Sequence, residues 1–435
     1  MQFSRFNYMF SSSCGSFIYN SVTNSFVKIS KQLKDRIESI REWNEDSMGM
    51  FSPELQKLLL EHKIIVKDGE DNDYVLLKRY AKLCSAFSQK SLGLTIATTT
   101  GCNFACPYCF EKGTEAFVMN EDVEKRVVEL VNNSISTSLF VTWYGGEPLL
   151  NFETIKRLTE CFSKIERLDH IGYSLITNGY YLTQDKIVFF KSHNLQDVQV
   201  TIDGLPAMHD RLRKAKNGTP TFDIIVSNVL NAASQLPRCR FNIRVNISKK
   251  NSEQYTQLVA LLKEKWKGTE NIHPYHAFVE DYGNCDVSCL NNEEKSDFVK
   301  LQTENGIISA KSLLPKSTLG VCMANSLNSF LIAPNGDVYK CWSDLGRKER
   351  MVASLMDDKS KNYLLLAHYA IDMDKMCDPR CEQCFLFPVC EGGCPQHRYT
   401  TAKGLQKHGT CSYQSTMLDS ILEMIYSEEK DNVKS

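Results

Sequence analysis

The chain has 435 residues, and its 51 Lys and Arg almost balance 52 Asp and Glu, which leaves a net charge of −1. A chain of this length has room for two or three hydrophobic cores, and the balanced charge gives no electrostatic reason to bind nucleic acid. The N-terminus lacks the charged start and apolar run of a signal peptide, and no apolar stretch approaches the roughly 18 residues of a membrane span. We therefore expect a cytoplasmic protein with no nucleic-acid or membrane partner.

The 17 cysteines are the unusual feature of the composition. An odd number in a chain without a signal peptide argues against a disulfide framework, because the cytosol keeps thiols reduced. Eight of them gather in two places, at 102–109 and at 377–394, which indicates metal binding. We expect the scattered ones to be ordinary buried thiols. These are Cys14, Cys84, Cys161 and Cys239.

Residues 1–90 are predicted to form a small domain. Strand-like runs at 15–20 and 25–29 flank a polar turn and predict a hairpin. Helical patterns follow at 32–43, 53–62 and 74–87, with a short strand at 64–67 and an acidic turn at 69–73. A hairpin with short helices is typical of a winged helix, but the pattern fits an N-terminal cap on the main domain equally well.

Residues 91–308 alternate strand and helix and define the fold class as α/β. The predicted strands are 92–99, 139–143, 173–177, 198–202, 241–247 and 273–279. The predicted helices are 121–131, 154–165, 184–191, 224–233 and 254–265. Six such units favour a partial (β/α)6, TIM-like barrel with active residues at the C-terminal strand ends. Residues 309–435 lose this periodicity, have no run suited to a core, and are predicted to fold around metal.

A triple-cysteine loop directly follows the first predicted barrel strand. Cys102, Cys106 and Cys109 have the spacing Cys-x3-Cys-x2-Cys. A [4Fe–4S] cluster normally takes four thiolates, so a loop with three leaves one iron open for a small molecule. Zinc is the alternative, but structural zinc sites favour paired Cys-x2-Cys knuckles.

This loop resembles the signature of the radical S-adenosylmethionine (SAM) superfamily. In that family, the amino and carboxylate groups of SAM chelate the open iron, and an electron from the cluster cleaves SAM to a 5′-deoxyadenosyl radical that abstracts a substrate hydrogen. The resemblance implies that Tyr108 lies near the adenine and that Gly145, Gly146 and Glu147 bind the SAM amino group. It further implies ribose and carboxylate contacts from Thr177, Asn178 and Thr201. Arg213 also matches a recurrent pattern, and its role stays open.

The later cysteines resemble the seven-cysteine SPASM pattern. Thirteen residues separate Cys322 from Gly336, and four more separate Gly336 from Cys341. The resemblance implies one fully ligated auxiliary [4Fe–4S] cluster on Cys381, Cys384, Cys390 and Cys411. It implies another on Cys322, Cys341 and Cys394, whose fourth ligand is either Cys377 or a substrate thiolate at an open iron. Zinc knuckles are the rival interpretation. Cys285 and Cys289 lie outside the pattern and are expected to be free thiols, with a substrate-facing role as the alternative.

The SPASM resemblance implies an oxidoreductase with three [4Fe–4S] clusters and SAM that modifies a ribosomally made precursor peptide by a thioether or carbon–carbon crosslink. Residues 1–90 would be a leader-recognition (RRE-like) domain whose strand edge pairs with the leader. An electron donor such as flavodoxin or ferredoxin is implied. The alternatives are a peptide epimerase, a non-catalytic metal scaffold, or a formylglycine-forming sulfatase maturase. Sulfatase maturases place an aspartate directly after the cysteine of Gly-x4-Cys, where this chain has Trp342, with Asp344 two residues on.

Overall fold

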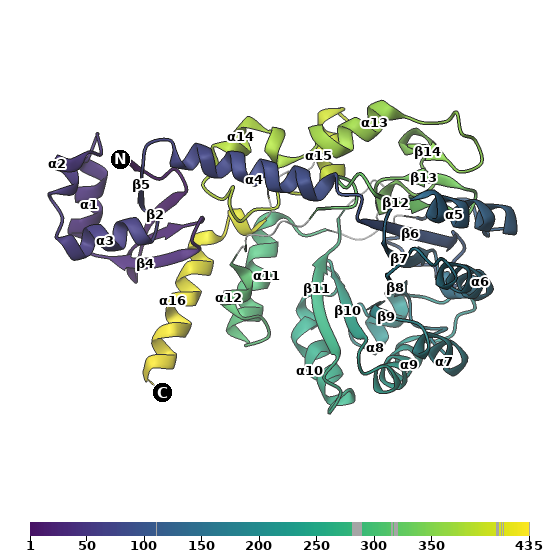
Figure 1. The fold of residues 1–435 in the computed structure, drawn as a ribbon. Coiled ribbons are helices and arrows are strands. Elements are labelled where there is room, and N and C mark those ends of the chain that lie inside the picture. The colour runs from purple at the N-terminus through teal and green to yellow at the C-terminus, as the bar shows by residue number, and fades with distance from the viewer. Residues whose placement is uncertain are drawn as a thin grey trace. The chain divides into compact units, whose positions relative to one another are not determined.

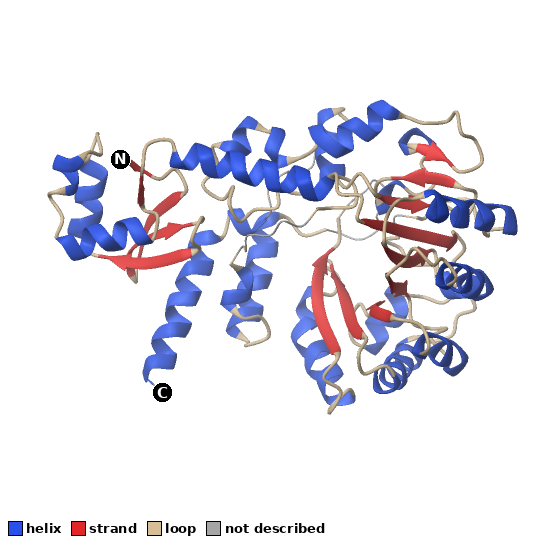
Figure 2. Cartoon of the chain, in the orientation of Figure 1, coloured by secondary structure: helices blue, strands red, loops and turns tan. Residues whose placement is uncertain are grey.

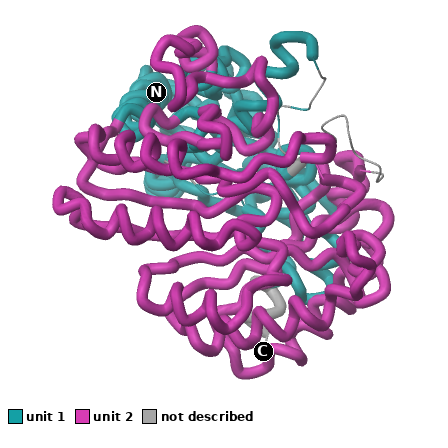
Figure 3. The backbone as a smooth tube through the Cα atoms, turned by 90° about the vertical axis from the view of Figure 1, so that its right-hand side faces the viewer, with its two compact units in different colours: residues 1–87, 299–325, 369–435 teal, residues 88–298, 326–368 magenta. Residues whose placement is uncertain are grey.

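The computed structural model describes residues 1–109, 111–280, 289–314, 316, 321–405, 409, 411 and 413–434. The chain forms two compact units (Figure 3). Unit 1 holds residues 1–87, 299–325 and 369–435, and unit 2 holds residues 88–298 and 326–368. These units divide the chain differently from the three domains 1–90, 91–308 and 309–435, which remain predictions. Across the described ranges, no helix is long and apolar enough to cross a membrane.

Unit 2 is built on six parallel strands that neighbour one another in chain order (Figure 1). They are β6 (Ser91–Thr99), β7 (Ser138–Gly145), β8 (His170–Thr177), β9 (Leu195–Thr201), β10 (Arg240–Ile247) and β11 (Ile272–Phe278). The intervening helices are α5 (Glu121–Asn133), α6 (Phe152–Ser163), α7 (Gln184–Lys191), α8 (Pro206–Leu212), α9 (Phe222–Gln235) and α10 (Tyr255–Lys265). Short 3-10 turns precede α6 and α10, at Pro148–Asn151 and Ser252–Gln254. Figure 2 shows helices along the outer side of the strands. The predicted partial barrel is confirmed.

The barrel sheet continues beyond the six predicted strands. β12 (Ser329–Ile332) pairs parallel with β6, so that Ser329 lies opposite Gly93. β13 (Asp337–Tyr339) and β14 (Ala353–Ser354) extend the sheet antiparallel. The expectation that no core forms beyond residue 310 is wrong here, because Leu331 and Ile332 are both fully buried. A four-residue strand needs few apolar residues when it joins an existing core, and so it leaves a weak sequence signal.

The N-terminal part of unit 1 is a three-stranded meander followed by helices. β2 (Asn7–Ser12), β3 (Gly15–Asn20) and β4 (Ser25–Ile29) pair antiparallel, which confirms the predicted hairpin of β3 and β4. β1 (Gln2–Phe3) pairs with β5 (Ile65–Val66). The helices are α1 (Lys31–Ser39), α2 (Glu45–Met48), α3 (Pro53–Glu61) and α4 (Glu70–Ala86). Side-chain caps from Ser30 and Ser52 begin α1 and α3.

The prediction of an acidic turn at 69–73 is wrong, because only Gly69 precedes the helix and residues 70–73 belong to it. Glu70, Asp71 and Asp73 form the first turn of α4, where the helix dipole favours carboxylates. Gly69 precedes the helix with a φ of +82°, a conformation that favours glycine. The helix therefore begins four residues before the predicted Tyr74.

The two ends of the chain share one hydrophobic core in unit 1. Phe10, Phe17 and Tyr19 of the meander pack with Leu386 and Leu422. The remaining helices are α11 (Asn292–Glu304), which starts in unit 2, and α12 (Ala310–Leu313), α14 (Pro379–Glu382), α15 (Pro395–Ala402) and α16 (Leu418–Lys434) in unit 1. α13 (Tyr363–Ala367) belongs to unit 2. Residues 1–87 therefore depend on C-terminal side chains for burial.

Candidate active site

A cavity of about 600 Å³ lies at the C-terminal strand ends of the barrel. Nine predicted site residues line it, from the loop after β6 and from the ends of β7, β8 and β9. They are Cys102, Cys106, Tyr108, Cys109, Gly145, Gly146, Thr177, Asn178 and Thr201. The tenth, Glu147, lies outside the lining and is fully buried. The structure thus brings the predicted cluster loop and strand ends to one hollow, as parallel strands in a barrel require.

The three loop thiols lie in surroundings that disfavour free thiolates. Burial raises the pKa of Cys102 to about 11 and that of Cys109 to about 12, and it raises the pKa of Cys106 as well. The charges of the other two thiols raise the pKa of Cys109 further, so the three interact electrostatically. A metal centre supplies the positive charge that holds such thiols ionised. The donor set therefore fits an iron–sulfur cluster.

The thiols are not already gathered around a point. Within the described part of the chain, no three Cys, His, Asp or Glu side chains form a group ready to hold a metal ion. Binding a cluster would therefore require the loop thiols to turn toward one another. Asn178 is one polar neighbour of these thiols. Its Nδ2 lies 4.0 Å from Cys102 Sγ and donates a 2.7 Å hydrogen bond to Asn103 Oδ1.

Gly145 and Gly146 let the second strand end lie directly against the cysteine loop. A Cβ on Gly145 would lie 2.1 Å from the Thr99 carbonyl oxygen, and one on Gly146 would lie 2.4 Å from the Gly101 carbonyl oxygen. The amides of Gly146 and Glu147 donate to these same two carbonyls, at 3.0 and 2.9 Å. The glycines therefore hold two strand ends together, in addition to leaving room for a ligand.

Glu147 is occupied by protein donors. Its carboxylate accepts hydrogen bonds from the Asn178 amide (2.7 Å), the Thr177 hydroxyl (2.7 Å) and the Leu149 amide (3.1 Å). Burial raises the pKa of Glu147, and these donors oppose that shift. In this structure the carboxylate fixes the end of β8, so the predicted contact with an ammonium group would require it to share these bonds.

Three buried groups link the cysteine loop to the end of β9. The carboxylate of Asp203 accepts a hydrogen bond from the Tyr108 hydroxyl and another from the Asn246 amide at 2.7 Å. Arg213 Nη1 lies 3.6 Å from Asp203 Oδ2 and donates to the Tyr108 hydroxyl at 2.9 Å. Arg213 also lines the cavity, and its buried Nε has no hydrogen-bond partner among the residues that the structure describes. Sequence reasoning did not propose a role for Asp203, although it follows Thr201 in the recognised motif.

The far half of the cavity was missed at the sequence level. Gln199, Arg244, Asn246 and Phe278, from β9, β10 and β11, line it. A signal was available in β10, where Arg240, Asn242, Arg244 and Asn246 alternate with Phe241, Ile243, Val245 and Ile247. The second set is almost fully buried, so the polar set occupies the opposite face of the strand.

Two further lining residues come from outside the predicted set. Burial raises the pKa of Glu111 to about 7, and a hydrogen bond with Tyr144 lowers it in part. Trp342 lies 5.4 Å from the Tyr144 ring, centroid to centroid, and lines the cavity, whereas Asp344 is fully buried and does not. The position after Cys341 therefore presents an indole to the cavity.

The C-terminal cysteines form a second thiol region in unit 1. The charges of Cys390, Cys381 and Cys411 all raise the pKa of Cys384, after the larger effect of burial. Arg398 Nη2 donates to Cys381 Sγ at 3.1 Å, while its Nη1 bonds Asp378 at 2.9 Å. The four thiols proposed for one auxiliary cluster are thus close enough for their charges to interact, although no three of them in the described ranges form a group ready to hold a metal ion.

The ligands proposed for the other auxiliary cluster do not all belong to one unit. Cys322, Cys377 and Cys394 belong to unit 1, and Cys341 belongs to unit 2. Cys285 lies outside the described residues, and Cys289 packs near Leu212, Val279 and Tyr108. The expectation of four buried scattered thiols holds only for Cys239. Cys84 of α4 is exposed and Cys161 of α6 is partly exposed, and Cys14 is partly exposed in the turn between β2 and β3.

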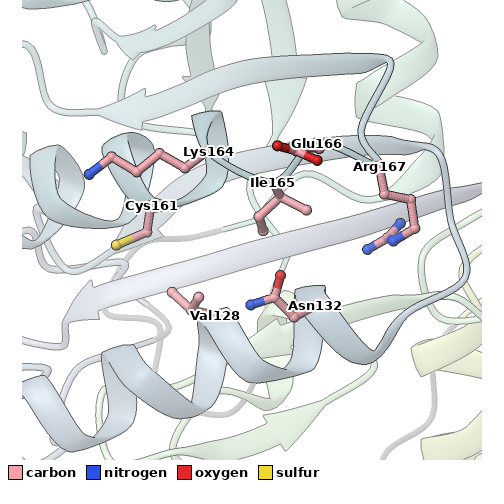
Figure 4. A pocket seen from close by; sticks show the side chains of 7 residues that line it. All are labelled: Val128, Asn132, Cys161, Lys164, Ile165, Glu166 and Arg167. Carbon is pink, nitrogen blue, oxygen red and sulfur yellow. The ribbon is translucent and has the colours of Figure 1, made fainter.

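A second hollow, of about 580 Å³, lies on the outer layer of helices (Figure 4). Cys161, Lys164 and Arg167 line it together with Val128 and Asn132 of α5. None of the predicted site residues lines this hollow, and it has no part in the chemistry considered below.

Comparisons with known proteins agree with the barrel and its cysteine loop. Residues 96–267 match the family model described as the radical SAM superfamily. A serine-type anaerobic sulfatase-maturating enzyme of Bacteroides thetaiotaomicron is 25% identical over 350 residues, which cover 70% of this chain and 82% of that protein.

Two solved structures share the fold. Native anSMEcpe with bound AdoMet and the Kp18Cys peptide has a TM-score of 0.58 and 21% identity, and the match covers 79% of this chain and 99% of that one. SuiB of Streptococcus suis bound to its precursor peptide SuiA has a TM-score of 0.52 and 15% identity, and the match covers 95% of this chain and 99% of that one.

Proposed function

We propose that this chain, which carries a radical SAM domain and is a radical SAM enzyme, modifies a ribosomally synthesised precursor peptide by forming a thioether or carbon–carbon crosslink. The observation that carries the proposal is the strand-end cavity. One half of this cavity is lined by the three-cysteine loop and by Gly145 and Gly146 at the end of β7. The other half is lined by polar residues of β9 to β11 and leaves room for a second substrate. A peptide segment is a ligand of suitable size and polarity for that half.

The cofactor proposal rests on the residues of the first half. Cys102, Cys106 and Cys109 would hold a [4Fe–4S] cluster, and the strand ends at Gly145, Thr177 and Thr201 would hold SAM. When bound, the cluster supplies the electron that cleaves SAM to the 5′-deoxyadenosyl radical. Glu147 positions the β8 end, and Arg213 places a cation beside Tyr108. We also propose two auxiliary [4Fe–4S] clusters in the C-terminal cysteine array and a flavodoxin or ferredoxin as electron donor.

A thioether crosslink balances as a two-electron oxidation. One hydrogen atom leaves the substrate carbon with 5′-deoxyadenosine, and the cysteine thiol loses its proton as sulfur bonds to that carbon. An auxiliary cluster held by the C-terminal cysteines would accept the remaining electron and return it to the donor protein. The product is therefore lighter than the substrate by two hydrogens, whereas epimerisation leaves the mass unchanged.

The meander of unit 1 supports a leader-recognition role. β3 is its central strand, so among the described residues β2 and β4 each keep one edge without a strand partner. An extended peptide can add to such an edge through main-chain hydrogen bonds. The SuiB match, which covers 95% of this chain, is to a structure with a bound precursor peptide.

Formylglycine formation in a sulfatase is the second candidate, because a curated relative is a sulfatase-maturating enzyme. Against it stands the residue after Cys341, where Trp342 lines the cavity and the nearby Asp344 is fully buried and away from the lining. No carboxylate from this segment lines the cavity, so general-base catalysis there lacks its expected residue.

The test is anaerobic reconstitution of the full chain, followed by incubation with SAM, a reductant and candidate precursor peptides. Release of 5′-deoxyadenosine together with a product lighter by two hydrogens supports the proposal. Formylglycine in a sulfatase peptide would instead support the second candidate, and deuterium uptake from heavy water at unchanged connectivity would indicate epimerisation. A bound metal that is zinc rather than iron would refute radical chemistry.

Leader binding needs a test that preserves the fold. Deleting residues 1–87 would remove half of a shared core, so a single substitution is preferable. Met9 in β2 lies opposite Ile18, and Lys28 in β4 lies opposite Phe17, the neighbouring residue of β3. Because the backbone groups of successive β3 residues point to opposite sides, the amides of Met9 and Lys28 both point away from β3. Met9→Pro and Lys28→Pro each remove one edge donor and serve as controls for each other. We expect one of the two to weaken leader binding by about tenfold in fluorescence anisotropy. Equal leader affinity in both variants and the wild type would refute edge pairing.

A further inference from the structure

Arg244 places a guanidinium inside the active-site cavity. It lies on β10 near the C-terminal end of the strand, and its Nε donates to Asn246 Oδ1 at 2.8 Å. Its charge also reaches the hydroxyl of Tyr275, the residue opposite it on β11. Tyr275 in turn donates to Gln199 at 2.8 Å. The guanidinium is therefore held in place by neutral groups.

The charge of Arg244 is not balanced by a carboxylate. No acidic side chain in the described ranges lies within 4.0 Å of its guanidinium, whereas Arg213 and Glu280, which also line the cavity, each have an ion-pair partner. Arg213 lies against Asp203, and Glu280 pairs with Lys295 at 2.8 Å. A cation in a partly buried cavity without a counter-charge favours an anionic ligand, because transfer from water leaves its donors unpaired. Arginine is suited to carboxylates, which it binds through two parallel hydrogen bonds.

The position of Arg244 favours the peptide over SAM as the source of that carboxylate. The residues proposed to contact SAM come from β6 to β9 and from Arg213. The groups that hold Arg244 lie instead on β10 and β11. Arg213, whose buried Nε has no hydrogen-bond partner in the described part of the chain, is the guanidinium that belongs to the SAM half.

We propose that Arg244 is a substrate-binding residue that recognises an acidic side chain, Asp or Glu, next to the modified residue of the peptide. This inference rests on the proposed peptide substrate and narrows it to a class of sequence. Tyr275 and Asn246 keep the guanidinium in place, and Phe278 adds an apolar side chain to the cavity lining.

The experiment uses the reconstituted full chain with SAM bound. The probes are fluorescent cysteine-containing peptides of one sequence in which a single Glu is moved along the chain, each paired with its Gln counterpart. Binding is measured by anisotropy for the wild type, Arg244→Gln and Arg244→Lys. Arg240→Gln is the matched control, since it changes the same residue type at the exposed opposite end of the same strand.

We expect the wild type to bind one Glu peptide at least about tenfold more tightly than its Gln partner. Arg244→Gln should remove this preference, Arg244→Lys should retain part of it, and Arg240→Gln should leave it intact. Equal binding of every Glu and Gln pair by the wild type overturns the inference. So does a tenfold loss of SAM affinity in Arg244→Gln with the peptide preference kept, because the carboxylate would then be that of SAM. Failure of the proposed function is a separate observation, the absence of any product from peptides that bind.

Discussion

The two thiol regions of this protein differ most in the charges around them. Near the barrel loop, the carboxyls of Glu147, Asp203 and Glu111 raise the pKa values of Cys102, Cys106 and Cys109, respectively, and the guanidinium of Arg213 lowers the first two. In the C-terminal region, Arg398 donates directly to Cys381, and Lys375 donates to the carbonyls of Phe387 and Cys390. Nearby cations stabilise the more negative, reduced state of a cluster, and nearby anions oppose it. We infer that a cluster on the barrel loop would be the stronger reductant, which suits SAM cleavage, and that one in the C-terminal region would suit electron acceptance.

The most direct test of this inferred difference between the two thiol regions is to remove one thiol from each. Cys102→Ala should abolish SAM cleavage, because an iron of the SAM-binding cluster loses its anchor. Cys384→Ala should leave SAM cleavage measurable while peptide modification is lost. Each variant should lose about four irons per chain. Iron assay and chromatography of 5′-deoxyadenosine check both outcomes, and loss of SAM cleavage in both variants would mean that the regions do not divide the chemistry.

The tight packing of the barrel site predicts a stability effect. Gly146→Ala should destabilise unit 2 by about 1–3 kcal/mol, because its Cβ would overlap the Gly101 carbonyl oxygen. It should also weaken SAM binding, since the cysteine loop must shift. Gly113→Ala is the control, with a φ of +87° but open space around the added methyl, and should cost about 1 kcal/mol through backbone strain alone. Denaturant titration and SAM equilibrium dialysis measure both, and equal effects would argue against the close approach.

Acid should loosen the barrel through His276 of β11. Burial among Tyr255, Phe278 and Phe298 lowers the pKa of His276 to about 4. Because the folded-state pKa lies below the unfolded value, the contribution to stability is complete above about pH 6.5 and is lost as pH falls toward 4. The loss should approach roughly 3 kcal/mol. Hydrogen exchange of the β10 and β11 segments should report it, and His276→Phe should flatten the dependence. An unchanged dependence in that variant would assign the acid effect to another group.

The smallest expected effect concerns the charge beside the C-terminal thiols. Arg398→Gln should lower the midpoint potential of a cluster on Cys381 by tens of millivolts, since one charge-assisted hydrogen bond to sulfur is lost. Arg398→Lys should fall between the two. Arg380→Gln is the control, because Arg380 also bonds Asp378 but is largely exposed. Anaerobic redox titration with electron paramagnetic resonance measures the shift, and a potential equal to that of the wild type would refute the inferred contrast.

The barrel was predictable from the sequence because its strands and helices have strong, separate periodicities. The six strands and the five predicted helices fall within a few residues of the predicted ranges, whereas the seven-residue α8 was not predicted. The radical SAM resemblance is confirmed by the family match over residues 96–267. The strand ends were predictable for the same reason, since a motif that follows a parallel strand must lie at the same edge of the sheet.

The missed features depend on contacts between distant residues. Both carboxylate oxygens of Glu147 accept a hydrogen bond from the end of β8, which no local pattern at Gly145–Pro148 indicates. β12 is recognisable only beside β6, its partner. The alternation of polar and apolar residues that includes Arg244 is visible in the sequence. That Asn246 and Tyr275 hold its guanidinium without a counter-charge is visible only in the structure.

The pairing of β12 with β6 has a consequence for how this protein can be dissected. β6 carries the cysteine loop at its end, and Ser329–Ile332 satisfy its outer backbone groups. In a fragment that stops before residue 329, β6 would be an unpaired edge strand, and such a strand can pair with another copy of the chain. The barrel is thus not a separable module, and a fragment of residues 88–298 should remain soluble only when a second polypeptide covering 326–368 is co-expressed to complete its sheet.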